Sequence, residues 1–318
     1  MASVLSAPQF HDEEAAYKYL EARVWPHGPH CPHCGGVERI SKMQGESTRI
    51  GCYKCYQCRK NFTVKVGTVF ESSHVKLHLW LQAVALLTSS KKGISSNQLH
   101  RILGVTVKTA WFMSHRIREA MSGGNNQKPL GGEGETVEAD ETYLWLQSDS
   151  QPSPQRKGRP YTRRSGDAAI RKRAIISLVE RGGSVRSFHV ESADRLTVQK
   201  IVSENISRET VLYTDESRIY MEAGKQFPEH STVTHSKKEY VRGIIHTNTI
   251  ESVFSVFKRG MRGIYQHCAE KHLHRYLAEF DFRYNNRIAL GVNDISRADN
   301  ALVGIVGKRL TYRTTSGR

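Results

Sequence analysis

The sequence TVEADETYLWL at residues 136–146 places a carboxylate, Asp140, among apolar residues that alternate as they do in a β-strand. A core strand does not tolerate such a carboxylate without a specific reason. The same situation recurs at Asp215, within VLYTDES at residues 211–217. The two segments therefore predict two strands that each present an aspartate.

Further elements lie on either side of these strands. The sequences RAIISLVE at 173–180 and SVRSFHV at 184–190 are strand-like, whereas RLTVQKIVSENI at 195–206 has helical spacing. Helices return from Thr249 onward. We therefore expect residues 136–292 to form an α/β domain with a mixed sheet.

A third acid, Glu251, opens the helical sequence NTIESVFSVFKRG, and thirty-five residues separate it from Asp215 (251 − 215 = 36). Two strand-borne aspartates and a helix-borne glutamate can hold two Mg²⁺ ions about 3.5–4 Å apart, as phosphoryl transfer requires. A single aspartate at a strand end is more often a cap or turn residue, so the spacing of all three acids carries the interpretation. Lys258 follows Glu251 by two helical turns, on the same helix face, where it can contact a DNA phosphate.

Two more glutamates, Glu138 and Glu141, neighbour Asp140. Alternation along a strand directs them to the opposite or an adjacent face. We therefore rank them below the three acids.

The first half of the chain contains a candidate metal centre. Cys31 and Cys34 form CPHC, Cys55 and Cys58 form CYQC, and twenty residues lie between the two pairs. Each pair supplies two thiolates at about 2.3 Å from a tetrahedral zinc ion, as in zinc ribbons. Four unmetallated thiols are the less favoured reading, because so short a segment cannot build a core unaided. Residues 1–73 are thus expected to form a leading helix, at 12–25, and a ribbon with one structural Zn²⁺.

Other ligands compete for this centre. Cys52 forms CYKC with Cys55, which overlaps the second pair, but the regular spacing favours Cys55 and Cys58. His30 and His33 flank the first pair, and four thiolates would leave them no role as ligands.

Residues 74–121 show helical periodicity, with breaks at Gly93 and Gly104. Residues 95–121 look like a helix-turn-helix, whose second helix enters the DNA major groove by its N-terminal residues. Helical hairpins that bind no DNA are common, so the adjacent ribbon and the chain's charge support this interpretation. The DNA-binding candidates on the second helix are Lys108, Thr109, Arg116 and Arg118.

Two polar segments follow. Residues 122–135 are rich in Gly, Asn and Pro and predict a linker, and residues 147–173 are strongly basic without hydrophobic periodicity. We expect the basic segment to be a mobile loop that contacts DNA, and residues 293–318 to be a C-terminal tail. The further DNA-binding candidates are Arg156, Lys157, Arg159, Arg163, Arg164 and Arg259.

Composition agrees with a nucleic-acid partner. The formal net charge is +16, and polyanion binding is the commonest reason for such an excess. Hydrophobic residues make up 38% of the chain, which is ordinary for a globular protein and argues against disorder. The sequence shows no 18-residue apolar stretch and no export signal, so we expect a cytoplasmic, nucleoid-associated protein without a membrane partner.

Together these segments resemble the zinc-ribbon DDE transposases of bacterial insertion sequences, whose catalytic domain is ribonuclease H-like. The matching sequences are WPHGPHCPHCGG, YQCRKNFTVKVGTVFESS, VEADETYLW, LYTDES and HTNTIESVFSVFKRGMRGIYQHCAEKHLHRYLAEFDFRYNNR. The resemblance implies that Asp140 and Asp215 are the first two acids, Glu251 the third and Lys258 the basic residue after it. Some relatives use Asn in place of the third acid, so Asn248 is a possible auxiliary ligand.

The resemblance also implies cofactors and partners. It implies two Mg²⁺ or Mn²⁺ ions, double-stranded DNA with terminal inverted repeats, a target DNA and a homo-oligomer on DNA. Two alternatives stay open: a non-catalytic DNA-binding regulator, and a nuclease of the same fold that does not join strands.

Overall fold

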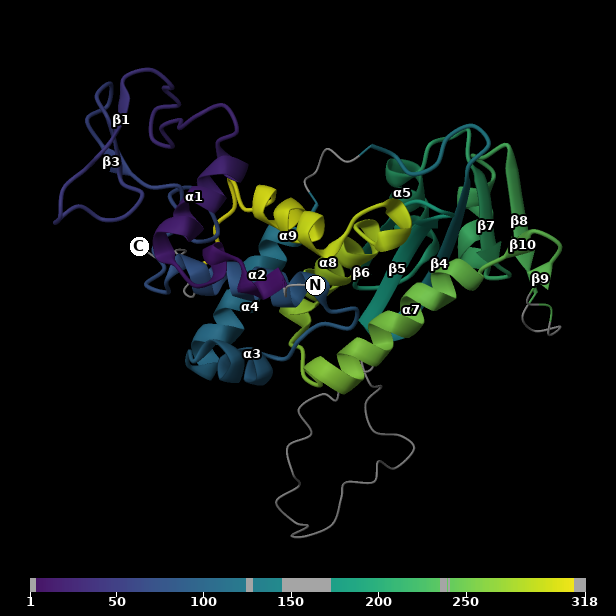
Figure 1. The fold of residues 1–318 in the computed structure, drawn as a ribbon. Helices are drawn as coiled ribbons and strands as arrows, with labels where there is room; N and C mark the ends of the chain where they lie inside the picture. Colours follow the sequence, from purple (N-terminus) through teal and green to yellow (C-terminus); the bar gives the residue numbers. More distant parts are fainter. Residues whose placement is uncertain (1–3, 124–127, 145–172, 235–238, 240, 312–318) are drawn as a thin grey trace, which may run out of the picture. The chain divides into compact units, whose positions relative to one another are not determined.

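The computed structural model describes residues 4–123, 128–144, 173–234, 239 and 241–311 (Figure 1). The chain forms two compact units. The first unit contains residues 1–124 and 278–318, and the second contains residues 125–277. The second unit is thus one continuous segment of the chain. Its C-terminal boundary, between residues 277 and 278, falls within helix α8 (Leu273–Asn285).

The first unit begins with the expected leading helix, α1 (Glu13–Val24). The Asp12 side chain accepts a hydrogen bond from the Ala15 amide and caps this helix. A small antiparallel sheet follows, in the order β1 (Ile40–Lys42), β2 (Tyr53–Cys55), β3 (Asn61–Phe62). Strands of two or three residues cannot hold a sheet by themselves, so this region needs a further cross-link.

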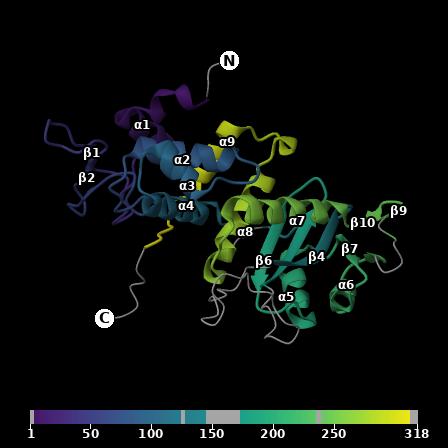
Figure 2. The same cartoon turned by 90° about the horizontal axis from the view of Figure 1, so that it is seen from below.

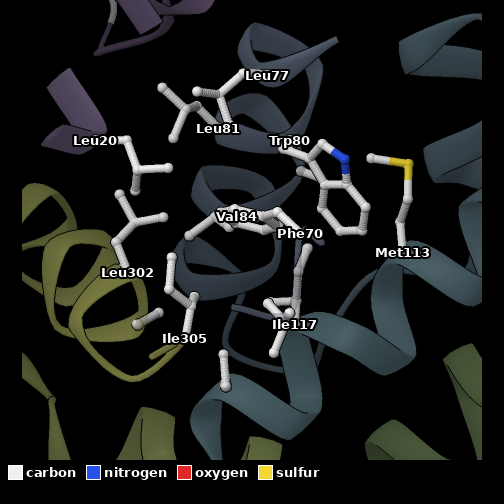
Figure 3. Close-up of a cluster of buried hydrophobic side chains, with 14 of the residues drawn as sticks. Leu20, Phe70, Leu77, Trp80, Leu81, Val84, Met113, Ile117, Leu302 and Ile305 are labelled. Atoms are coloured by element: carbon white, nitrogen blue, oxygen red, sulfur yellow. The ribbon is translucent and has the colours of Figure 1, made fainter. Parts of the chain in front are cut away.

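Three helices form the predicted helical part of the first unit: α2 (Leu77–Ser89), α3 (Ser96–Leu103) and α4 (Val107–Met121). Gly104 ends α3 in the left-handed region at φ 65°, and the Thr106 side chain caps α4. Side chains of α2 and α4 pack with Phe70 into a shared hydrophobic core (Figure 3).

Helix α9 (Asp294–Val303) also contributes to this core. It lies in the segment that we expected to be a C-terminal tail. Leu302 and Ile305 are buried against the helices of the same unit (Figure 3). Asp299 accepts a 2.6 Å hydrogen bond from Arg23 of α1. The segment is therefore part of the folded core up to Ile305.

The second unit is built on a five-stranded sheet in the order β6-β5-β4-β7-β8. Its strands are β4 (Thr136–Leu144), β5 (Arg173–Glu180), β6 (Val185–Val190), β7 (Val211–Asp215) and β8 (Glu229–Val233). Strands β4, β5 and β6 are antiparallel neighbours, whereas β7 and β8 run parallel to β4. Three antiparallel strands followed by two parallel ones make the ribonuclease H-like fold, as expected.

Helices cover both faces of this sheet (Figure 2). Helix α5 (Arg195–Asn205) packs Val198 and Val202 with Val137 and Ala139 of β4. Helix α7 (Asn248–Gly260) lies on the other face, beside β4 and β5. The shorter elements of this unit are η3 (Arg218–Tyr220), α6 (Met221–Gly224), β9 (Val241–Arg242), β10 (Ile245–His246), η5 (Met261–Tyr265) and η6 (Glu270–His272).

Part of the expected linker belongs to the second unit. Leu130 is buried, and its backbone pairs with Asn205 at 2.8 Å and Ser207 at 2.9 Å. Gly131, at φ 75°, lies so close to Thr210 that a Cβ would approach its side chain to 2.3 Å. The fold of the second unit therefore begins a few residues before the predicted boundary at residue 136.

None of the helices in the described part of the chain is both long and apolar enough to cross a bilayer.

Candidate active site

The two aspartates meet because of the strand register. Ala139 of β4 pairs with Thr214 of β7 in the last step of the parallel ladder, so Asp140 and Asp215 follow at neighbouring positions. Among the described residues, these two acids and Glu141 form one group, in which a carboxylate oxygen of each lies within 4.8 Å of the others. The Asp215 carboxylate also accepts a 3.0 Å hydrogen bond from the Ser217 amide, which fixes its orientation.

The structure corrects our ranking of the two neighbouring glutamates. Glu141 belongs to the acidic group, although alternation directs it away from Asp140. Both residues lie beyond the last paired position of β4 and β7, where their side chains can reach the same point. Glu138 is two residues from Asp140 and therefore shares its face of β4.

The electrostatics of the acidic group favour a bound cation. Burial, followed by the carboxylates of Asp215 and Glu141, raises the pKa of Asp140 to about 8. Burial and Asp215 also raise the pKa of Glu141. Carboxylate oxygens are the ligands that Mg²⁺ and Mn²⁺ prefer, and such an ion would offset this repulsion. The residues present thus fit a divalent metal site.

Glu251 is exposed in the first turn of α7 and is not one of the three grouped acids. Its carboxylate is close enough to raise the pKa of Asp140, although by less than the carboxylates of Asp215 and Glu141 do. The Thr247 hydroxyl donates a 3.3 Å hydrogen bond to its carboxylate. Asn248, the possible auxiliary ligand, is exposed at the first position of α7, three residues before Glu251.

Lys258 lies on α7, two turns after Glu251. Burial and the nearby Arg262 lower its pKa, while Asp140 acts in the opposite direction. The side chain is therefore half-buried within electrostatic reach of Asp140. Such an ammonium group is well placed to meet a phosphate beside the carboxylates.

The four predicted cysteines form a second group, whose Sγ atoms all lie within 4.8 Å of one another. Cys31 and Cys58 are 3.6 Å apart, and Cys34 and Cys55 are 3.7 Å apart. This clustering matches four thiolates around one zinc ion.

The competing ligands lie outside the cysteine group. The Cys52 sulfur is 3.7 Å from that of Met43, just before β2 begins. His30 packs edge-on against Trp25 instead. The choice of Cys31, Cys34, Cys55 and Cys58 agrees with this arrangement.

The DNA-binding candidates of α4 separate into two kinds. Lys108 is exposed and Thr109 half-exposed at the first turn. Arg116 is buried and donates hydrogen bonds to the carbonyls of Leu310 and Glu71, at 3.1 and 3.0 Å. Arg118 is 1% exposed.

The buried arginines have structural partners. The Arg118 guanidinium donates a 2.5 Å bond to Glu279, which also pairs with Arg283. A guanidinium with this burial cannot reach a DNA backbone, so Arg116 and Arg118 hold the first unit together instead. Arginine is rarely buried unless it is paired. The sequence did not predict the burial of Arg118, because its partner Glu279 lies 161 residues away in the chain.

Arg259 is exposed near the end of α7. The remaining candidates, Arg156, Lys157, Arg159, Arg163 and Arg164, lie outside the described residues.

A ribonuclease H-like sheet with acids clustered where its two central parallel strands end defines the class of metal-dependent enzymes that act on nucleic-acid phosphodiesters. Family comparison makes this specific: residues 129–285 match the ISXO2-like transposase domain, and residues 11–61 match the transposase zinc-ribbon domain. The chain belongs to the zinc-ribbon DDE transposases with an ISXO2-like catalytic domain.

One relative is an uncharacterized protein in transposable element ISH50 of Halobacterium salinarum. It is 29% identical over 239 residues, which are 73% of this chain and 77% of the relative.

Two solved structures show weaker similarity. A chain of the simian T-cell lymphotropic virus intasome, in complex with the PP2A regulatory subunit B56 gamma, matches at 12% identity and a TM-score of 0.29. That match covers 57% of this chain and 63% of the intasome chain. The Mos1 strand transfer complex matches at 12% identity and a TM-score of 0.28, over 71% of this chain and 74% of that one. The fold assignment rests on the sheet order and the family match.

Proposed function

We propose that this chain is a DNA transposase that cleaves DNA at the terminal inverted repeats of its insertion sequence and joins the freed 3′ ends to target DNA. The observation that carries the proposal is the group of Asp140, Glu141 and Asp215 within a DDE transposase domain. Burial and mutual repulsion raise the pKa values of Asp140 and Glu141, and a cation bound between the carboxylates would offset that repulsion.

Each residue then has a defined role. Asp140, Asp215 and Glu251 would hold two Mg²⁺ or Mn²⁺ ions, and Glu141 would offer a further oxygen beside the aspartates. Such ions supply charge stabilisation for the attacking and leaving oxygens of an in-line displacement. Lys258 binds a phosphate next to the scissile bond. The reaction needs no covalent protein intermediate, because a water molecule or a 3′-OH is the attacking group.

The first unit would deliver the DNA ends. Its zinc ribbon, held by one structural Zn²⁺, and the α3–α4 pair offer exposed basic residues such as Lys108. Arg259 and the basic residues between 156 and 164 would add contacts to the DNA backbone. Joining two ends also requires two active sites, which favours a homo-oligomer on DNA.

The deciding experiment is strand cleavage and strand transfer on labelled DNA that carries the element's terminal repeats, with Mg²⁺. We expect joining by the wild type and its loss in Asp140→Ala, Asp215→Ala and Glu251→Ala. Glu204→Ala is the matched control, because it removes an exposed acid on α5, on the other face of the sheet. A parallel Glu141→Ala variant tests whether the fourth carboxylate is required.

Other outcomes identify the alternatives. Binding to the repeats without cleavage would favour a regulator. Cleavage without joining would favour a nuclease of the same fold.

A further inference from the structure

Glu138 is a charged residue with 0% exposure in the core of the second unit. A buried carboxylate is costly unless several donors satisfy it. Here Oε1 accepts hydrogen bonds from Arg181 Nε at 2.7 Å and from the Thr249 hydroxyl at 2.8 Å, and Oε2 accepts one from the Ile250 amide at 3.0 Å. Two of these three donors belong to helix α7.

These two donors lie at the start of α7, where backbone amides lack partners within the helix. Thr249 and Ile250 are its second and third residues, and Thr247, at the cap position, makes no side-chain cap. Glu138 therefore does from strand β4 what a cap residue normally does from within the chain. A carboxylate at this end of the helix also interacts favourably with the positive end of the helix dipole.

The same carboxylate anchors the chain that leads into α7. Arg181, which is bound to Glu138, also donates to the carbonyls of Ile244 and His246, both at 2.8 Å. His246 Nδ1 lies 3.3 Å from the Glu138 carboxylate. The residues before the helix and its first turn are thus both tied to β4.

The contacts of Glu138 connect the two elements that carry candidate active-site acids, strand β4 with Asp140 and helix α7 with Glu251. Glu138 precedes Asp140 by two residues on the same face of β4, and Glu251 directly follows the bound amide of Ile250 (Figure 1 shows α7 beside β4). Glu251 is exposed and is held in its own helix by a 3.3 Å bond from Thr247. The Glu138 contacts tie the first turn of its helix, next to Glu251, to the strand that carries Asp140.

We propose that Glu138 is a positioning residue that sets the place of Glu251 relative to Asp140 by capping α7 from β4. The proposal rests on the proposed function, since it assumes that Glu251 is a metal ligand. It assigns Glu138 no contact with metal or DNA. Loss of Glu138 should therefore weaken the contribution of Glu251 without removing any ligand.

A purely structural role is the alternative, and the chain contains a matched control. Glu13 caps α2 in the same way from α1, by accepting hydrogen bonds from the amides of Leu77 at 2.8 Å and His78 at 3.2 Å. Glu13→Ala thus removes an equivalent cap in the first unit. It reports the loss of stability that follows when such a cap is lost far from the acidic group, together with the 2.8 Å contact of Glu13 with His78 Nδ1.

The test measures Mn²⁺ binding to the zinc-loaded full chain by electron spin resonance, together with the kcat and KM of strand cleavage. Glu138→Ala should weaken the Mn²⁺ binding that Glu251→Ala also weakens, by about ten- to a hundredfold, as for other residues that orient a ligand. The Glu138→Ala, Glu251→Ala double variant should bind Mn²⁺ no more weakly than Glu251→Ala alone. Cleavage should lose kcat and keep its KM for DNA.

Glu138→Gln keeps an acceptor oxygen for the Ile250 amide, so it should retain more Mn²⁺ affinity than Glu138→Ala and remains measurable if the alanine variant does not fold. The proposal is overturned if Glu138 variants lower the melting temperature as Glu13→Ala does and keep wild-type Mn²⁺ binding and kcat. It is also overturned if Glu251→Ala leaves Mn²⁺ binding unchanged. A wild type whose Mn²⁺ binding depends on Glu138 and Glu251, but which cuts no DNA, would support the positioning role and contradict the proposed function instead.

Discussion

Asp140 is a residue whose charge the folded chain disfavours. Its pKa rises from an ordinary 3.8 to about 8, mainly through burial and then through Asp215 and Glu141. Without a divalent ion, the folded state therefore binds this proton more tightly than the unfolded chain. The resulting stability is fully present below about pH 4 and is lost as the pH rises towards 8.

Asp140→Asn imitates the protonated acid, so its effect should change with pH. We expect similar melting temperatures for variant and wild type near pH 4, and a more stable variant near pH 8 in buffers without Mg²⁺. Added Mg²⁺ should raise the melting temperature of the wild type far more than that of the variant, since the ion favours the charged form. Calorimetry at several pH values measures this difference, and a gap that does not vary with pH would contradict it.

The sequence predicted the elements well where periodicity was strong. The strands at Thr136–Leu144 and Arg173–Glu180 and the helix at Arg195–Asn205 lie where alternation and helical spacing placed them. Strand β8, Glu229–Val233, was missed because EHSTV is short, polar and at the sheet edge, so it carries no hydrophobic pattern. Helix α9 was missed because its buried residues pack against helices that are distant in the sequence.

The site was also predictable only in part, because some of its contacts join residues that are distant in the sequence. Cysteine spacing fixes a metal site locally, and the four cysteines form one group as predicted. The closeness of Glu141 to Asp215 depends on the pairing of β4 with β7, and the burial of Arg118 depends on Glu279. No local pattern contains these tertiary contacts.

The zinc ribbon is the element most dependent on its cofactor. Its three strands have only two or three residues each, and Trp25 packs edge-on against Tyr53 and Phe62, with ring centroids 5.4 and 5.8 Å apart. Removal of zinc should unfold the ribbon and expose Trp25, because the metal supplies folding energy that so small a core lacks. Tryptophan fluorescence during chelation measures this as a shift to longer wavelength.

The Trp25→Phe variant is the control for this signal, because Trp80 and Trp111 remain in the helical part of the unit. It should lose most of the shift while releasing the same amount of zinc. An unchanged spectrum after complete zinc release would show that the ribbon folds without metal.

At the scale of the whole molecule, a formal charge of +16 acts on every DNA phosphate that the chain approaches. Direct contacts differ from this general attraction, because each neutralised phosphate releases counterions and steepens the dependence of affinity on salt. Lys108, exposed in the first turn of α4, should make such a contact. Lys200 is exposed on α5, on the face of the sheet opposite α7, and should make none.

Lys108→Ala and Lys200→Ala each remove one positive charge, so they change the overall attraction equally. We expect Lys108→Ala to reduce the slope of log affinity against log salt by about 1, and Lys200→Ala to leave the slope unchanged. Fluorescence anisotropy on terminal-repeat DNA at several salt concentrations measures both slopes. Equal slopes would mean that the charge of the whole chain, and not a contact by α4, governs DNA binding, and the DNA-reading role of the α3–α4 pair would then have to be given up.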